Sequence, residues 1–364
     1  MTEAKEAKAP ALGRFGPPKK TPYQVWQSGE GVPLYTGSFL ENLHETELAP
    51  WARFGVNGAF VNLAEQQEDD GWVFEIPPAS QSEVLHHAFE ASIYVVEGRG
   101  ATRFWQPDSP PQTVEWQRGS LFSPPMNCYY QHFNADGQQR VRLFMVTNAP
   151  MVINAYRNPD FLFNNPYVFS ERYNGEADYF SGAGEYSGNN GRHWKTNFIP
   201  DVRKFKLEPG DRGGGDMGMQ WILANNQSVG HCSEFDPGTY KKAHRHGVGA
   251  YVIILEGTGY SLMWFGDEER RRVDWKDGTV ISPQTGEYHQ HFNTSPGHAR
   301  YMAFRPGDLD THRPKPGTSW NTEAELNGIP YEDEDTAIYD LYVEECAKQN
   351  AKIVMPRPDY AASK

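Results

Sequence analysis

A segment of about sixty residues occurs twice in this chain, in one unbroken register. Shifting the sequence by 159 positions superimposes Gln131-His132-Phe133-Asn134 on Gln290-His291-Phe292-Asn293. The same shift pairs further identical residues at structurally demanding positions: Glu75/Glu234, Pro78/Pro237, His87/His246, Glu97-Gly98/Glu256-Gly257, Gly100/Gly259, Trp105/Trp264, Trp116/Trp275, Gly119/Gly278 and Ser123-Pro124/Ser282-Pro283. Chance does not hold one register across so many Trp, Gly, Pro and His positions. The chain is therefore a duplicated domain, and its function is sought where the two copies differ.

The duplicated text predicts an all-β protein. Its 364 residues suffice for two domains with separate cores. Short β-branched or aromatic runs closed by turn residues occur in the first copy and recur in the second, at 59–63, 72–76 and 92–96 and again at 219–223, 251–255 and 260–264. Many short strands at even spacing favour two tandem antiparallel barrels or jelly rolls.

Composition changes outside the two copies suggest how the chain is divided. The Ala-, Lys- and Pro-rich start predicts a flexible arm, and acidic residues ahead of an apolar 3-to-4 spacing predict a C-terminal helix. The segment between the copies is expected to hold one helix near Pro159–Tyr173. The expected divisions are an arm at 1–20, a first barrel at 21–150, a linker at 151–198, a second barrel at 199–321 and a helical tail at 322–364.

Charge and cysteine content narrow the function classes. The net charge of −13 is spread along a chain without an extended basic block, which excludes nucleic acid and anionic membranes as favoured partners. No apolar run has spanning length, and no signal-type segment follows Met1, so we expect a soluble protein. Cys128, Cys232 and Cys346 are odd in number and widely spaced, which is typical of reduced thiols in the cytoplasm.

The second copy carries a constellation of histidines suited to a metal. His244 and His246 are two residues apart, so on a strand both imidazoles leave the same face. His289 lies on a later strand and can approach this pair across a narrow barrel. Three converging neutral imidazoles suit Fe(II), Mn(II), Ni(II), Co(II) or Zn(II).

The first copy has lost most of this set. The positions equivalent to His244, His246 and His289 are Leu85, His87 and Tyr130, so one ligand of three survives. An alternative first-barrel site would use His86, Glu90 and His132 instead. Because His86 and His87 are neighbours, a strand would turn them to opposite faces. We therefore expect no tightly bound metal in the first barrel.

These motifs resemble those of the cupin superfamily. The family's two motifs are roughly G-x5-H-x-H-x3,4-E-x6-G and G-x5-P-x-G-x2-H-x3-N. The second copy supplies His244, His246 and Gly257 for the first motif and Gly278, Gly286, His289 and Asn293 for the second. Two positions depart from the pattern. Ala250 stands where many cupins place a metal-binding Glu, and Pro283 lies one residue early.

A three-histidine set without a carboxylate is similar to that of bicupin ring-cleaving dioxygenases of the gentisate and 1-hydroxy-2-naphthoate type. The resemblance implies a ferrous ion that chelates a hydroxyl and a carboxylate of the substrate and then binds dioxygen. It covers the two motif blocks, roughly 75–146 and 230–305. In the gentisate enzymes the metal lies in the first barrel, whereas here the full triad is in the second.

Further residues are candidates for handling a substrate. Three neutral ligands leave the charge of the ion uncompensated, so the site should favour a small anionic substrate. His291 shares a face with His289 and is a candidate proton handler, although its equivalent His132 in the ligand-poor copy favours a structural hydrogen bond equally. Arg300, or nearby Arg305, is a candidate anion clamp, with a structural role as the alternative.

Three functions remain open from the sequence. The first is a mononuclear non-haem iron dioxygenase acting on a small hydroxy-aromatic or enolic acid. The second is a lyase, isomerase or hydrolase that uses Mn, Ni or Zn at the same triad without oxygen. The third is a non-catalytic ligand-binding or storage bicupin. In each case we expect the barrels to pack face to face and the chain to form a homo-oligomer.

Overall fold

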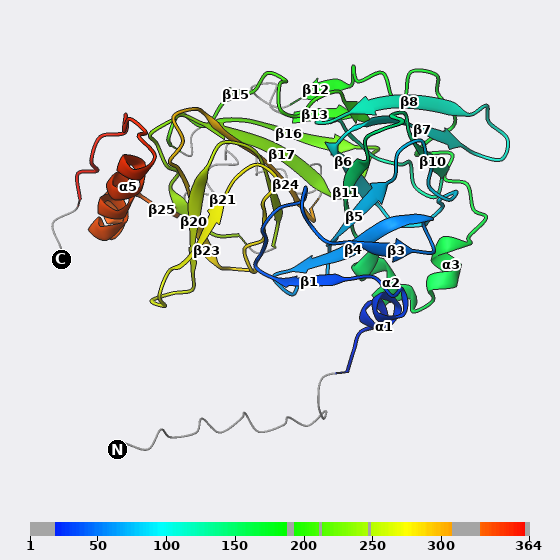
Figure 1. Cartoon of the computed structure of the whole chain (residues 1–364), viewed down its shortest axis with the longest axis horizontal. Helices are drawn as coiled ribbons and strands as arrows, with labels where there is room; N and C mark the ends of the chain where they lie inside the picture. The colour runs from blue at the N-terminus through cyan, green and yellow to red at the C-terminus, as the bar shows by residue number, and fades with distance from the viewer. Residues whose placement is uncertain (1–18, 188–192, 211–212, 247–248, 308–327, 361–364) are drawn as a thin grey trace.

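A computed structural model describes residues 19–187, 193–210, 213–246, 249–307 and 328–360. Two β-barrels lie side by side, with small helices beside the first barrel and one longer helix against the second (Figure 1). The predicted all-β class, the tandem barrels and the C-terminal helix are confirmed. Most of the predicted arm, through residue 18, lies outside the described residues, as do 308–327 at the junction of the second barrel and the tail.

The first barrel follows helix α1 (Pro22–Gly29). Its strands are β1 (Leu34–Gly37), β3 (Ala49–Trp51), β4 (Val56–Leu63), β5 (Asp70–Ile76), β6 (Ala91–Glu97), β7 (Arg99–Trp105), β8 (Gln112–Gln117), β9 (Leu121–Phe122), β10 (Tyr129–Asn134) and β11 (Val141–Thr147). One sheet has the order β1-β4-β5-β11-β6-β9, and the facing sheet has the order β10-β7-β8. Alternating apolar residues point inward and build a core rich in aromatic rings.

The second barrel repeats this plan. Its elements are β12 (Glu185–Ser187), β13 (His193–Thr196), β15 (Glu208–Pro209), β16 (Met217–Leu223), β17 (Val229–Phe235), β18 (Ala243–His244), β19 (Tyr251–Glu256), β20 (Gly259–Trp264), β21 (Arg271–Trp275), β22 (Val280–Ile281), β23 (Tyr288–Asn293), β24 (Ala299–Arg305) and β25 (Gly328–Ile329). One sheet runs β12-β13-β16-β17-β24-β19-β22, and the other runs β21-β20-β23-β18-β25.

The two barrels exchange short strands. β2 (Phe39–Leu40) pairs with β22 of the second barrel, and β14 (Phe198–Ile199) pairs with β9 of the first. Phe39 and Phe198 are separated by the repeat spacing of 159. The duplication therefore reaches further towards the N-terminus than the sequence motifs indicated, and the segment predicted as a linker supplies a strand to the first barrel.

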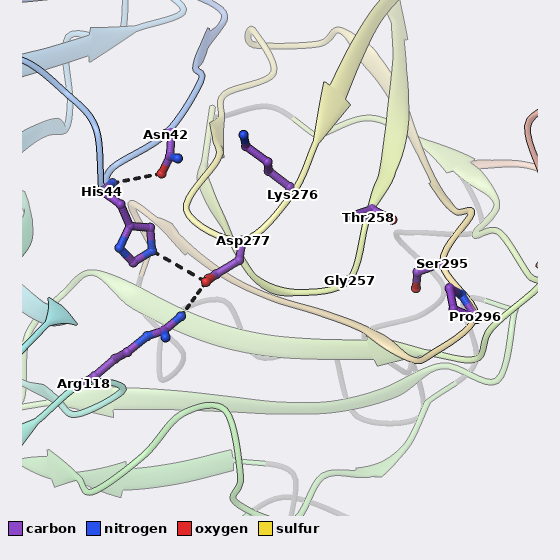
Figure 2. A pocket seen from close by; sticks show the side chains of 9 residues that line it. All are labelled: Asn42, His44, Arg118, Gly257, Thr258, Lys276, Asp277, Ser295 and Pro296. Atoms are coloured by element: carbon purple, nitrogen blue, oxygen red, sulfur yellow. Dashed lines mark hydrogen bonds and ion pairs between the residues drawn. The ribbon is translucent and has the colours of Figure 1, made fainter. Parts of the chain in front are cut away.

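Apolar and polar contacts both join the barrels. The Tyr251 hydroxyl donates to the Val61 carbonyl oxygen across the interface at 2.9 Å. At the rim, Asp277 forms an ion pair with Arg118 and lies 3.6 Å from the His44 Nε2 atom (Figure 2). Arg118 and Asp277 occupy equivalent positions of the two repeats. These residues line an open pocket between the barrels. The three candidate metal ligands, His244, His246 and His289, do not line this pocket.

The helical prediction for the linker is corrected. Instead of one helix near 159–173, the structure has α2 (Ala149–Tyr156) and the short α3 (Pro159–Phe163). The latter is capped by Asn158, whose side chain accepts from the Phe161 amide at 3.1 Å. It ends before Pro166, because the residue preceding a proline is disfavoured in helical conformation.

The C-terminal helix α5 (Thr336–Lys348) follows the short 3₁₀ turn η1 (Tyr331–Asp333). Asp335 caps it by accepting from the Ala337 amide at 3.0 Å, as the acidic pattern predicted. Its apolar face, including the fully buried Tyr342, packs against the outside of the second barrel. No helix in the described part of the chain is long and apolar enough to cross a membrane.

A buried acid near the barrel interface makes stability depend on pH. Asp69 is buried, and within the described residues its Oδ2 atom has no hydrogen-bond partner. Burial, followed by the nearby charge of Glu90, raises the pKa of the Asp69 carboxyl to about 8. Because the pKa of Asp69 is higher in the folded state than in the unfolded state, the folded state keeps this proton up to a higher pH. The stability contribution is complete below the unfolded pKa of about 4 and falls as the pH rises to about 8.

Asp69→Asn should therefore reduce the pH dependence of the unfolding free energy, because the amide carries no charge to bury. Relative to the wild type, we expect the variant to gain at least about 1 kcal/mol of unfolding free energy between pH 5 and pH 8. Urea unfolding at both pH values measures this gain. Asp108→Asn, at an exposed acid, is the matched control and should show no such gain. Parallel pH profiles for Asp69→Asn and the wild type would contradict the assignment.

Candidate metal centre

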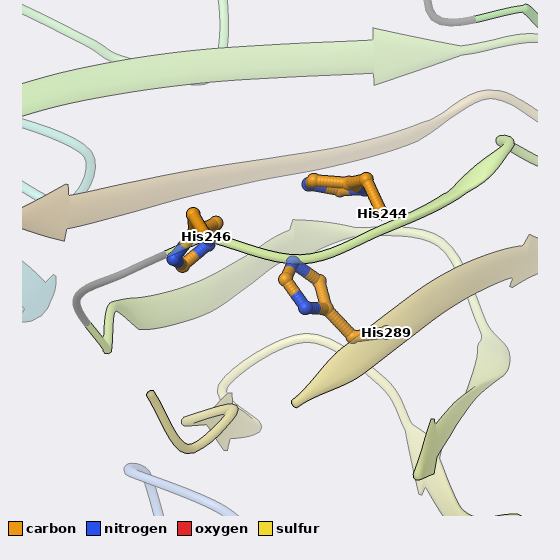
Figure 3. Close-up of side chains that lie close together, drawn as sticks. All are labelled: His244, His246 and His289. Atoms are coloured by element: carbon orange, nitrogen blue, oxygen red, sulfur yellow. The ribbon is translucent and has the colours of Figure 1, made fainter. Parts of the chain in front are cut away.

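Strand pairing brings the three histidines of the second barrel together. His244 of β18 lies directly opposite His289 of β23, and His246 follows two residues later. The His289 ring centroid lies 4.2 Å from that of His244 and 4.9 Å from that of His246. All three side chains converge on one region (Figure 3). The sequence prediction that a distant histidine joins the His-x-His pair is therefore met in the geometry.

The donor set fits a divalent ion. One ring nitrogen from each of His244, His246 and His289 lies within 4.8 Å of the others. The Nδ1 atom of His289 is 3.1 Å from the Glu287 carbonyl oxygen, so Nδ1–H donates there and leaves Nε2 as the ligand atom. This cluster has no acidic member, and Ala250 is buried at the position where the motif has Glu. Three neutral nitrogens suit a borderline transition metal.

The equivalent place in the first barrel is closed. Leu85 pairs with Tyr130, and the Tyr130 hydroxyl lies 2.8 Å from the His87 Nε2 atom. The other ring nitrogen of His87 is 2.9 Å from the Phe89 carbonyl oxygen, so both nitrogens are engaged. Burial lowers the pKa of His87 to about 3, which keeps the ring neutral.

The alternative ligands of the first barrel do not converge. His86 stacks on Tyr129, with ring centroids 4.2 Å apart. Glu90 pairs with Arg172 at 3.1 Å, and the His132 Nδ1 atom lies 2.7 Å from the Thr102 hydroxyl. Among the described residues, the only cluster with metal-ligand geometry is the triad of the second barrel.

His291 lies beside the triad but is fixed by a bond that recurs in both barrels. Its Nδ1 atom is 2.7 Å from the Ser261 hydroxyl, to which the Trp275 indole donates at 3.1 Å. In the first barrel, His132, Thr102 and Trp116 form the same arrangement. The repetition indicates a structural role for this bond. The His291 ring nevertheless lies 5.7 Å from that of His289, within reach of a ligand held there.

Arg300 does not reach the histidines, and the anion-clamp hypothesis for it is corrected. Its guanidinium donates to the Arg203 and Phe205 carbonyl oxygens at 2.5 and 2.6 Å. Its strand neighbour Tyr301 packs against His291, with ring centroids 5.2 Å apart. Because adjacent strand residues face opposite ways, Arg300 points out of the barrel. Arg142 does the same in the first copy, where it donates to the Leu43 carbonyl oxygen at 2.8 Å.

A buried ion pair inside the second barrel was not predicted from the sequence. Lys241 is fully buried, pairs with Asp216 and donates to the Ser233 hydroxyl. Its ammonium also lies 5.2 Å from the ring centroids of Phe235 and Tyr301. The repeat register held the signal, because Lys241 replaces Ser82 of the first copy. A charged residue at a buried position of only one copy marks a place where the barrels differ.

Comparison with known proteins yields likeness of structure alone. No family model matches the chain, and no curated protein matches it. Two solved structures of oxalate decarboxylase, one of them from Bacillus subtilis, are 11% and 10% identical and cover 84% of each chain, with TM-scores of 0.50 and 0.51. A salicylate 1,2-dioxygenase from Pseudaminobacter salicylatoxidans is 11% identical over 66% of this chain and 71% of its own, with a TM-score of 0.49. The oxalate decarboxylase match shows that the chain has the tandem cupin fold, and at these identities it shows the fold only.

Proposed function

We propose that the protein is a metal-dependent enzyme that binds one divalent ion through His244, His246 and His289. We further propose that this ion is Fe(II) and that the enzyme is a non-haem dioxygenase acting on a small hydroxy-aromatic or enolic acid. The observation that carries the proposal is the convergence of three neutral imidazoles without an acidic member. The motif resemblance to three-histidine ring-cleaving dioxygenases supports the choice of reaction.

The donor set explains the preference for an anionic substrate. Neutral ligands leave the double charge of the ion uncompensated, so a carboxylate or phenolate is a favourable additional ligand. Because three protein ligands do not complete an octahedral shell, a chelating substrate and a further small molecule have room to bind. A ferrous ion held there would supply Lewis acidity and the reducing equivalents that dioxygen chemistry requires.

The surrounding residues have separate tasks in this proposal. The Glu287 carbonyl oxygen holds the His289 ring in the tautomer that presents Nε2. His291 is fixed at Nδ1 by Ser261, so its Nε2 edge is the part that can exchange a proton with a substrate hydroxyl. Ala250, buried at the position where the motif has Glu, supplies no carboxylate to the ion.

Metal content and oxygen consumption test the proposal together. The protein should be purified without chelators or nickel resin, and its metals quantified. We expect about one iron per chain, and an iron-reconstituted sample should consume oxygen only with a hydroxy-aromatic or enolic acid from a panel. Stoichiometric Mn, Ni, Co or Zn without oxygen uptake would favour a non-oxidative lyase, isomerase or hydrolase. A chain that retains no metal after reconstitution would be a binding protein instead. The cytoplasmic location and the homo-oligomer remain predictions.

A further inference from the structure

Equivalent cross-strand rows differ sharply between the two barrel interiors. In the first barrel, Phe60, Trp72 and Met145 lie opposite one another on β4, β5 and β11. In the second barrel, the row at the same place on β16, β17 and β24 contains Gln220, His231 and Ala303. The pairing register is the same in both, because Met145 is opposite Ile93 and Ala303 is opposite Val252 on the next strand.

This row fills the first barrel. The Trp72 ring lies 5.7 Å from both Phe60 and Phe89, and Phe89 stacks on His87 with ring centroids 3.9 Å apart. Trp26 from α1 packs on the same row and lies 5.5 Å from Trp72. Aromatic side chains thus occupy the space in front of the one surviving histidine of the first barrel.

The same place in the second barrel is polar and reaches solvent. The side chains of Gln220 and His231 are only half-buried, whereas Phe60 and Trp72 are fully buried. Arg305 follows Ala303 on the same face of β24, where the first barrel has Thr147. Compared with its equivalent in the first barrel, each residue of this row in the second barrel therefore has either a shorter apolar side chain or a polar one.

Gln220 carries an unsatisfied acceptor. Its Oε1 atom is buried and has no hydrogen-bond partner among the described residues. Burying such an atom without a hydrogen bond is unfavourable, and an apolar residue such as the Phe60 of the first barrel avoids that cost. An acceptor retained at this cost, on the inner face of the barrel that holds the triad, is available to a ligand.

A continuous series of rings connects this row to the triad. The His231 ring centroid lies 6.1 Å from that of Tyr301, and Tyr301 lies 5.2 Å from His291. The His291 ring is in turn 5.7 Å from His289. His231 of the polar row is therefore connected to the triad through Tyr301 and His291, which lie between the two facing sheets of the second barrel.

We propose that Gln220 and His231 form the substrate-recognition wall of the metal centre. The ligand class is a chelating organic acid with a second hydroxyl on the side away from its chelating atoms. That hydroxyl donates to Gln220 Oε1, while His231 supplies a further polar contact beside it. This inference rests on the proposed function, because the chelating end of the ligand is held by the ion at the triad.

The test uses the full chain loaded with Co(II), whose visible spectrum reports ligands entering the site. The probes are 2-hydroxybenzoate, 2,4-dihydroxybenzoate and 2,5-dihydroxybenzoate, which share one chelating group. We expect one dihydroxy probe to bind about fivefold or more tightly than 2-hydroxybenzoate. Gln220→Met, of similar size, should remove this preference, with the cobalt content of the variant measured alongside. Gln81→Met, at an exposed glutamine, is the matched control and should keep the preference.

A charged variant independently tests whether Gln220 lies close to the bound probe. Gln220→Glu should weaken all three probes, because its carboxylate would oppose an anionic ligand. A preference that survives in Gln220→Met, the lack of any preference in the wild type, or unweakened binding to Gln220→Glu would each overturn the recognition wall. Failure of the wild-type protein to retain cobalt would instead refute the proposed function, so the two failures are distinguishable.

Discussion

His289→Ala is expected to abolish metal retention, whereas His87→Ala in the first barrel should leave about one ion per chain. His289 is the ligand directly opposite His244, and two remaining imidazoles cannot hold a divalent ion through purification. Both ring nitrogens of His87 are engaged, one with the Tyr130 hydroxyl and the other with the Phe89 carbonyl oxygen, so neither can bind a metal. Elemental analysis after gel filtration, with a thermal melt to confirm folding, measures the difference.

The pair of variants also decides how many sites exist. Both histidines occupy equivalent barrels and both are buried, so each substitution disturbs a similar environment. His244→Ala, at a half-buried ligand, should match His289→Ala in metal loss with less effect on the core. Equal loss of metal from His87→Ala and His289→Ala would refute the single-site account.

Lys241→Met should destabilise the protein by about 3–5 kcal/mol, the second large effect that we expect. The methionine leaves the Asp216 carboxylate without its ammonium partner inside the second barrel, where both side chains are almost completely buried. Replacing both members, in Lys241→Met with Asp216→Leu, should recover most of the loss, because no unpaired charge then remains.

Urea unfolding of the wild type, both single variants and the double variant forms a complete cycle. Metal content of each folded variant is the companion readout, because the pair contacts Ser233 and Tyr301 rather than the triad. Additive destabilisation in the double variant would show that Lys241 and Asp216 do not act as a pair.

The repeat register predicted the fold and the converging histidines because it depends on local pattern. Strand periodicity turns His244 and His246 to one face, and the narrow barrel brings His289 of another strand close to them. The loss of ligands at Leu85 and Tyr130 was equally visible, because equivalent positions can be compared without any structure.

Other features depend on tertiary context that the motifs do not carry. The two-residue strands Phe39–Leu40 and Phe198–Ile199 are too short to show a strand pattern in the sequence. Their exchange between the barrels was therefore not predicted. Arg300 was proposed as a clamp from its chemistry, although alternation with the inward-facing Tyr301 turns it away. The polar row at Gln220 and His231 became apparent only when the ladders of the two barrels were compared.

Anomalous diffraction from crystals grown with Fe(II) or Co(II), recorded above and below the metal absorption edge, tests the central claim most directly. We expect one strong anomalous peak per chain, about 2.0–2.2 Å from a ring nitrogen of each of His244, His246 and His289, and none beside His87. A peak in the first barrel, or a second-barrel ion without these three ligands, would contradict it.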